Sequence, residues 1–286
     1  MTARRTIVAA ALAGLLAAPA VRAQTLRTLS SSRQLHGERA LDVDVTYVAG
    51  RFRLVPAAPG TLYQMEMRYD EDKFTPVREY DPASGTLRLG LRSLGHVTLA
   101  DHRDQDNVPT LDLALAAGLP MALSVELGAA DADSDFGGLA LTSLHYKTGA
   151  SRSQLRFSRP NLAACSDVSF DVGAAQFTAV GLGNLGCRRM KFDGGVGAVT
   201  LDFTGAWRGA AVAEISVALG TVKLRLPQGL GVAIRLDRFL ASFDQEGFTR
   251  RGDVYYSDGY TAARDHLDLK VESAFGGIQV EWVAGR

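Results

Sequence analysis

The sequence predicts an all-β protein, a β-solenoid with rungs of about 22 residues that follows a signal peptide. Three observations carry this prediction. Glycine is abundant, at 30 of 286 residues, while proline is scarce, at 9, which suits tight turns and close backbone approaches. Apolar and polar residues alternate over many short stretches. Glycines that end these stretches recur at nearly regular intervals.

Residues 1–23 predict a cleavable signal peptide. A pair of arginines precedes an apolar run from Ile7 to Ala18, and Ala23 completes a small-residue cleavage site, so Gln24 is the expected first mature residue. An uncleaved anchor is the alternative, but the run is shorter than the ~20 residues that a spanning helix needs. We therefore expect a periplasmic or secreted protein with no membrane span after cleavage.

The charge of the mature chain argues against nucleic acid as a partner. The 31 basic residues of the full sequence, less the three within residues 1–23, leave 28 against 31 acidic residues, a net charge of about −3. Nothing in this balance attracts a polyanion.

The repeat emerges when five glycines are aligned. Before each of them stand alternating, mostly apolar residues, which predicts a strand with one buried face. The glycines are Gly128, Gly149, Gly173, Gly195 and Gly220, and the alternating residues are Leu123, Val125 and Leu127; Leu144, Tyr146 and Thr148; Val168, Phe170 and Val172; Met190, Phe192 and Gly194; and Ile215, Val217 and Leu219. A chain that repeats this unit stacks coil on coil.

The pattern extends outward, and residues 24–286 are expected to form one solenoid domain. Gly50 closes a similar alternating stretch near the N-terminus, and residues 56–120 are looser. Near the C-terminus, the alternating stretch after Gly276 matches the stretch after Gly220.

Residues 227–266 depart from the repeat and are expected to form a cap or side loop. Apolar residues between Arg235 and Gly247 have helical spacing, namely Leu236, Phe239, Leu240 and Phe243. This spacing predicts a short amphipathic helix or a loop packed on the coil.

Five stretches together are typical of one family. They are Leu119 to Gly128, Phe136 to Leu139, Gly194 to Gly197 with Leu201 to Gly205, Leu219 to Pro227 and Ala274 to Glu281. Their ordered set resembles the toastrack-type β-solenoid domain of LiaF-like envelope proteins. The resemblance implies a single-stranded, right-handed solenoid in the cell envelope, in a family linked to the response to cell-wall-active antibiotics. It implies no catalytic residues and no cofactor.

Two motifs that suggest ligand sites are interpreted as turns. Gly181 to Gly186 spells G-x-G-x-x-G, but a dinucleotide site needs a helix next, and the repeat predicts a strand. Asp131, Asp133 and Asp135 begin like a Ca²⁺ loop, but Thr142 stands where an EF-hand needs a bidentate acid. A solvated acidic turn or a partial cation site in that turn fits the remaining pattern.

No catalytic constellation is found, and no metal site is predicted. The five histidines (His36, His96, His102, His145 and His266) lack metal-binding spacing. The outward positions Glu126, Lys147, Asp171, Lys191 and Ala218 do not form the column of carboxylates that a glycan-cleaving solenoid needs. We therefore expect a non-enzymatic binding or structural module, active in envelope stress response or adhesion. A carbohydrate-active lyase or hydrolase on the same architecture is the alternative.

The densest aromatic and charged cluster is the candidate binding surface. It consists of Arg250, Arg251, Tyr255, Tyr256 and Tyr260. Arginines beside aromatic faces suit contact with a glycan or a peptide. The alternative is that the tyrosines close the side or end of the coil. The expected partner is an unidentified protein, peptide or glycan of the envelope, and the solenoid ends also permit self-association.

The two cysteines hold the same phase in consecutive rungs. Cys165 precedes Gly173 by eight residues, and Cys187 precedes Gly195 by eight. Stacked strands lie about 4.8 Å apart, which a disulfide tolerates, and an oxidising compartment favours the bond. The alternative is a pair of buried, stacked thiols.

Overall fold

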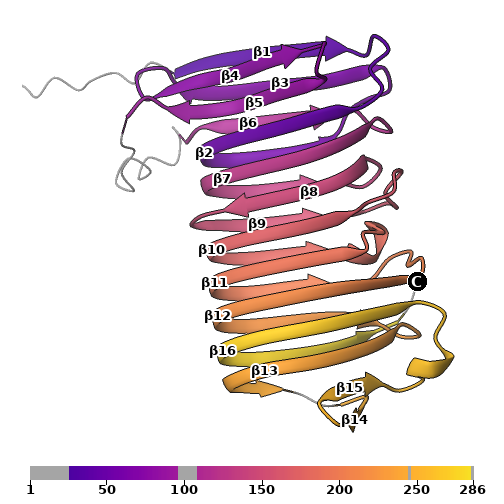
Figure 1. Cartoon of the computed structure of the whole chain (residues 1–286). Coiled ribbons are helices and arrows are strands. Elements are labelled where there is room, and N and C mark those ends of the chain that lie inside the picture. The colour runs from indigo at the N-terminus through magenta and orange to yellow at the C-terminus, as the bar shows by residue number, and fades with distance from the viewer. Residues whose placement is uncertain (1–25, 96–107, 244–245, 285–286) are drawn as a thin grey trace, which may run out of the picture.

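The computed structural model describes residues 26–95, 108–243 and 246–284, which form one sheet of sixteen strands wound into a coil (Figure 1). The signal peptide, Gln24, His96 and His102 lie outside these residues. The strands are β1 (Leu26–Gln34), β2 (Leu41–Pro56), β3 (Thr61–Asp70), β4 (Phe74–Asp81), β5 (Thr86–Ser93), β6 (Thr110–Leu115), β7 (Pro120–Asp135), β8 (Ala140–Thr148), β9 (Ser151–Arg156), β10 (Asp167–Val180), β11 (Arg189–Asp202), β12 (Ala210–Pro227), β13 (Gly231–Phe243), β14 (Phe248–Arg251), β15 (Val254–Ser257) and β16 (His266–Val283). The 3₁₀ helices η3 (Leu182–Asn184) and η4 (Tyr260–Ala262) lie between strands.

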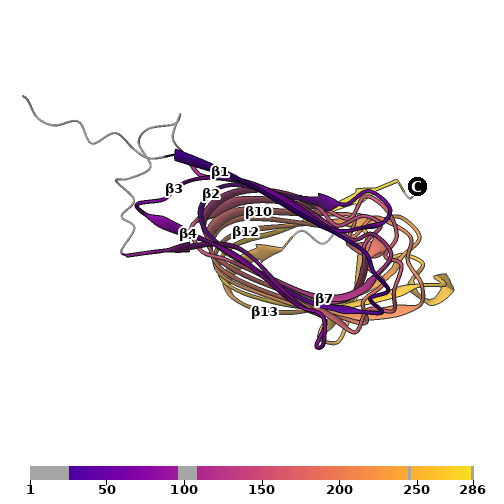
Figure 2. The same ribbon diagram turned by 90° about the horizontal axis from the view of Figure 1, so that it is seen from above.

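Each regular rung is a long strand bent near its middle, so that its halves lie on opposite sides of a flattened coil (Figure 2). The first half of β10 pairs in parallel with β8, and its second half pairs with β9. Phe170 of β10 stands beside Phe192 of β11, which stands beside Ile215 of β12. Each of these partners follows the one before it by about the predicted rung length, which confirms the repeat.

Glycine occupies the bends because the backbones of neighbouring rungs approach each other closely there. A Cβ added to Gly195 would lie 3.0 Å from the carbonyl oxygen of Gly173. At Gly220, φ is 144°, and a Cβ would lie 1.9 Å from the carbonyl oxygen of Gly197. No side chain fits at Gly220 without displacing the backbone.

The stacking corrects the predicted alignment at Gly220 by two residues. Gly220 lies beside Gly197 and Gly276, whereas Ala218 continues the column of Gly195. The physical reason is that β11 pairs with β12 at an offset shorter than the spacing between Gly195 and Gly220. The predicted alignment therefore combines glycines that precede the bend with a glycine that follows it.

A slip of two residues keeps the same strand face inward, so most of the predicted core survives the correction. Val217 is buried, although Ile215 is the residue that shares the position of Phe170. Leu219 is the exception. It lies past the bend and is 49% exposed, against the prediction that it points inward.

Rung order in space departs from chain order at both ends. The last strand, β16, lies between β12 and β13 and pairs in parallel with both (Figure 1). In sequence β13 follows β12, but in space β13 lies two places from β12, and β16 occupies the position between them. In the same way, β2 lies between β7 and the strands β5 and β6. The stretch after Gly276, which matches the stretch after Gly220 in its sequence pattern, stacks directly on it.

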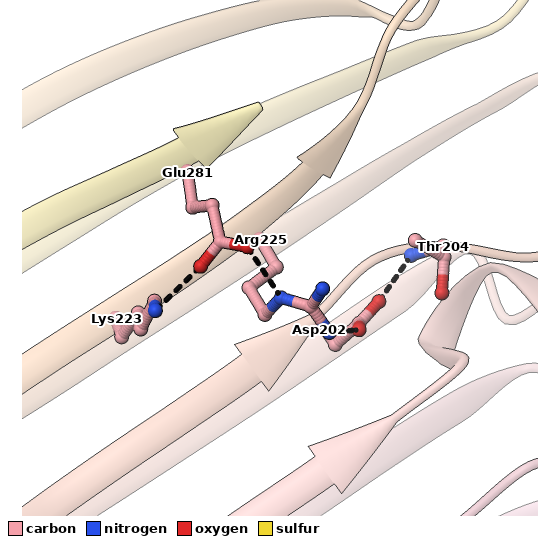
Figure 3. Close-up of polar contacts among 5 residues, drawn as sticks. All are labelled: Asp202, Thr204, Lys223, Arg225 and Glu281. Atoms are coloured by element: carbon pink, nitrogen blue, oxygen red, sulfur yellow. Dashed lines mark hydrogen bonds and ion pairs between the residues drawn. The ribbon is translucent and has the colours of Figure 1, made fainter. Parts of the chain in front are cut away.

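A chain of ion pairs ties β16 to the two rungs before it (Figure 3). Arg225 of β12 contacts Asp202 of β11 at 2.5 Å and Glu281 of β16 at 3.3 Å. Lys223 contacts Glu281 at 2.5 Å, and this ammonium holds the pKa of Glu281 below its usual value. Asp202 is buried and also accepts the backbone N–H of Thr204 at 2.8 Å. Arg225 is therefore the compensating charge for a buried carboxylate.

Antiparallel strands cover the N-terminal end, in the region predicted to be looser. β3 pairs with β6, β1 pairs with β3, and β4 pairs with β5.

The prediction of a helix or loop within residues 235–247 is wrong for residues 235–243. Residues 231–243 form β13, which pairs in parallel with β16. Backbone pairing with a neighbouring strand outweighs the helical spacing of the apolar side chains. The β14–β15 hairpin closes this end, where β15 pairs with Ala233 to Arg235.

Cys165 and Cys187 form a disulfide between consecutive rungs, as predicted. Their Cα atoms are 4.4 Å apart, and both side chains are buried. The bond covalently links the segments that lead into β10 and β11.

Candidate functional site

An open groove of about 880 Å³ runs across the rungs at the bend, and we call it the bend groove. It crosses β8, β10, β11, β12, β16 and β13 in spatial order. Its floor consists of the small residues Gly149, Gly173, Gly195, Ala218 and Ala274. Close backbone approach requires small residues here, so the geometry of the coil itself creates the hollow.

Carboxylates stand along one side of the bend groove, on successive strands. In register they are Asp171 of β10, Asp193 of β11, Glu272 of β16 and Asp237 of β13, with Ser216 of β12 between Asp193 and Glu272. Neighbouring strands place these positions about 4.8 Å apart. The prediction that outward residues form no carboxylate column is therefore wrong.

The error has two sources. Lys191 stands four residues before Gly195, whereas Asp171 stands two residues before Gly173, so the equivalent residue is Asp193. The misalignment at Gly220 put Ala218 in the place of Ser216. In the structure, Asp193 stands beside Asp171, and Lys191 stands beside Ser169. Counting back two residues from Gly173 and Gly195 finds Asp171 and Asp193, and the pairing of Gly197 with Gly220 sets the register of β12.

Lysines pair with two members of this column, and a histidine lies beside a third. Lys191 contacts Asp193 at 2.7 Å, Lys270 contacts Glu272 at 2.5 Å, and His145 lies 3.6 Å from Asp171. These pairs form a row of alternating charge beside the groove.

The titration of Glu272 is set by its partner. Its hydrogen bond to Lys270 lowers the pKa of Glu272 and raises the pKa of Lys270. A general acid in glycoside cleavage needs a raised pKa. Glu272 is therefore suited to accept hydrogen bonds from a ligand, and not to donate a proton.

An exposed apolar ridge borders the groove floor just past the bend. It consists of Val196, Leu219 and Phe275, which stack in register on β11, β12 and β16. Their side chains are 51%, 49% and 46% exposed. Contiguous apolar groups on a surface mark contact sites, and this ridge follows the groove floor directly in sequence without lining the groove itself.

The structure brings the five residues of the predicted cluster together at the C-terminal end of the coil, outside the bend groove. Arg250 and Arg251 lie on β14, Tyr255 and Tyr256 lie on β15, and Tyr260 lies in η4. The Arg250 guanidinium is 5.6 Å from the ring centre of Tyr255, and Arg251 is 5.7 Å from that of Tyr256. The Tyr256 and Tyr260 rings meet edge to face at 4.9 Å.

The members of this cluster differ in exposure. Tyr255 is buried and packs on Phe243 at 5.1 Å, so it closes the end of the coil. Tyr256 and Tyr260 are half-buried, and burial raises the pKa of Tyr260. Both arginines are exposed. A ligand at this end would contact the arginines and the two half-buried rings.

Of the two motifs interpreted as turns in the sequence, one forms a turn and the other does not. Gly181 to Gly186 form the turn between β10 and β11 that contains η3, as predicted. Asp131, Asp133 and Asp135 do not form a turn, because β7 continues to Asp135, and Arg156 contacts Asp133 at 2.7 Å. Within the described residues, no group of three or more His, Cys, Asp or Glu side chains is placed to hold a metal ion. No helix in that part of the chain has the length and apolarity to cross a membrane.

The chain belongs to the toast_rack family. The family model that matches describes the N-terminal domain of toast_rack, DUF2154, over residues 22–180, which is more than half of the chain. This confirms the family expected from the sequence. The match ends with β10, so the part of the bend groove on β11, β12, β13 and β16 lies beyond it.

Similar solved structures include a "putative cell adhesion protein" from Clostridium sporogenes, with 14% identity and a TM-score of 0.48, covering 91% of this chain and 100% of that one. A "putative adhesin" from Bacteroides fragilis has 8% identity and a TM-score of 0.38, covering 89% and 97% of the two chains. Another, from Parabacteroides merdae, has 11% identity and a TM-score of 0.32, covering 91% and 95%. No curated protein matches the sequence.

Proposed function

We propose that the protein is an exported, non-enzymatic binding module that holds a segment of an envelope polymer along the bend groove. The observation that carries the proposal is the continuous groove of about 880 Å³ across six strands. Five strand intervals of about 4.8 Å give it a length of roughly 24 Å. An extended polymer can therefore lie along the coil axis and contact every rung.

The charged side of the groove and the apolar ridge next to its floor favour a glycan as this polymer. On the charged side, the acidic groups are largely paired with lysines and a histidine, so a strongly charged ligand gains little there. Hydroxyl groups can both donate to such carboxylates and accept from such ammonium groups. The ridge of Val196, Leu219 and Phe275 offers apolar contact to the C–H face of a sugar ring.

Ala218 allows a direct test, because it is exposed on the groove floor between two rungs. We expect Ala218→Trp to fill the groove and to weaken binding to purified peptidoglycan sacculi at least tenfold in a co-sedimentation assay. Gln279→Trp is the matched control, since Gln279 is an exposed residue of β16 on the other half of the rung.

Equal binding by both variants would exclude the groove as the binding site. An additional Arg250→Ala, Arg251→Ala variant shows whether the hairpin cluster at the end of the coil contributes to binding.

A carbohydrate-active enzyme is the second candidate, because Asp171 and Asp193 stand on adjacent strands within the groove. Release of reducing ends or unsaturated sugars during the same incubation, and its loss in Asp193→Asn, would support that candidate instead.

Export is part of the proposal, and the disulfide supports it, since such bonds persist in oxidising compartments. We expect the intact mass of the exported protein to begin at Gln24, because Ala23 completes the cleavage site. Mass spectrometry of the periplasmic and culture fractions checks this. An N-terminus at Met1 in the membrane fraction would contradict it.

A further inference from the structure

We infer that β1 is a docking edge for a second copy of this chain, and that two copies pair β1 to β1 in an antiparallel, two-fold arrangement. This goes beyond the proposed function, because the edge lies at the N-terminal end of the coil, away from the bend groove on β8 to β13. Among the described residues, β1 pairs with β3 alone and ends the sheet (Figure 1). Its other edge therefore presents main-chain N–H and C=O groups.

The centre of β1 lacks the devices that normally protect such an edge. β1 is nine residues long, without proline, and its centre, Thr28 to Ser32, is uncharged. Its pairing with β3 is regular up to a shift at Arg33 and Gln34. Proline, charged residues, bulges and short length are the usual means of keeping an edge strand from pairing.

Other terminal strands of the same coil carry those devices. β4, which pairs with β5 alone, contains Pro76 in its first half and Arg78, Glu79 and Asp81 in its second half. β14, at the opposite end of the sheet, is four residues long and ends in Arg250 and Arg251. Protection at these edges and its absence from the centre of β1 distinguish β1 as the edge that is open to pairing.

A second β1 is the occupant that fits best, because an antiparallel pair of identical strands satisfies both edges through one two-fold axis. The two arginines of β1 do not oppose this pairing, since each is already engaged within its own chain. Arg27 forms an ion pair with Glu71, and the Arg33 guanidinium lies 4.4 Å from the ring centre of Tyr80. The centre of the interface would then be the uncharged residues around Ser30.

The size of the contact sets its expected strength. Pairing of at most nine residues on each chain is a small contact beside the roughly 1,200–2,000 Å² of a stable interface. We therefore expect a dimer that depends on protein concentration. Such pairing would place two bend grooves in one particle and increase avidity for a polymer.

Charge reversal near the two-fold axis tests this pairing by sedimentation velocity on the exported protein. Ser30 is exposed, and neither variant removes a side-chain hydrogen bond found for it. We expect the unaltered protein to form a dimer as its concentration rises from about 1 µM to 1 mM. Ser30→Lys alone and Ser30→Glu alone should each weaken the dimer at least tenfold, because like charges face each other across the axis. An equimolar mixture of the two variants should restore it.

Thr75→Lys and Thr75→Glu are the matched controls, because Thr75 is an exposed residue of β4. They should dimerise like the unaltered protein. Far-UV circular dichroism and thermal unfolding confirm that all variants are folded. A protein that stays monomeric up to about 1 mM would overturn the proposal. So would a dimer that is equally strong in the Ser30 variants, or a mixture that stays monomeric.

Discussion

Phe170→Asp is expected to leave the protein unfolded at 25 °C. The Phe170 side chain is 2% exposed, and its ring lies 5.4 Å from that of Phe177 and 6.4 Å from that of Phe192. Truncating a buried phenylalanine costs about 3–5 kcal/mol, and burying a carboxylate without a partner adds several more. The sum is comparable to the roughly 5–15 kcal/mol that stabilises a typical domain. Circular dichroism and urea unfolding measure the loss.

Asp171→Ser, one residue further on, is the control and should change stability by less than about 1 kcal/mol. Asp171 points outward, and in its pair with His145 at 3.6 Å both side chains are close to half exposed. Such pairs contribute little because water screens them. Equal losses at Phe170 and Asp171 would show that the strand faces are assigned the wrong way round.

The strand faces were predictable from the sequence because alternation is a local property. Val168, Phe170 and Val172 alternate with polar residues, and all three are buried. The fold class follows from the repetition of this pattern. The position of each strand along the coil could not be predicted in this way, because it depends on register between chain segments that are distant in sequence.

The place of β16 shows why rung order could not be predicted. In a simple repeat, β13 would stack on β12, because it follows β12 along the chain by about one rung. Instead, β16 stacks on β12, although the whole of β13 and the β14–β15 hairpin lie between them in sequence. The choice depends on contacts such as Arg225 with Glu281, which no local pattern reveals. The spacing of Leu236 and Phe243 was equally ambiguous, because it fits a helix until a neighbouring strand is known.

The two candidate surfaces also differ in how far each could be predicted from the sequence. The hairpin cluster was found because Arg250 and Tyr255 are neighbours in sequence and remain neighbours across β14 and β15. Asp193 could have been placed beside Asp171 from the sequence, because each precedes its aligned glycine by two residues. Glu272 and Asp237 join the column only through the observed order of β12, β16 and β13. The complete column requires the correct order and register of these strands, and a slip of two residues changes its members while keeping the same strand face outward.

Removing the disulfide is the second change with a large expected effect. Replacing both Cys165 and Cys187 by alanine should lower the free energy of unfolding by about 3 kcal/mol. The bond closes a loop across a sequence separation of 22 residues, and without it the unfolded chain regains the entropy of that loop. Alanine is the appropriate replacement because both positions are buried and a serine hydroxyl would need a partner there. Urea unfolding of the oxidised protein and of the variant gives the difference.

Reduction of the unaltered protein separates the effect of the bond from the effect of the smaller side chains. If the bond is the source of the stability, dithiothreitol should lower the urea midpoint of the unaltered protein and leave that of the double variant unchanged. Thiol titration of the denatured, unreduced protein should find no free thiol, since the two cysteines of the chain are bonded to each other. Two free thiols would contradict the bond but not the stacking, because stacked cysteines on neighbouring rungs also pack as small apolar residues.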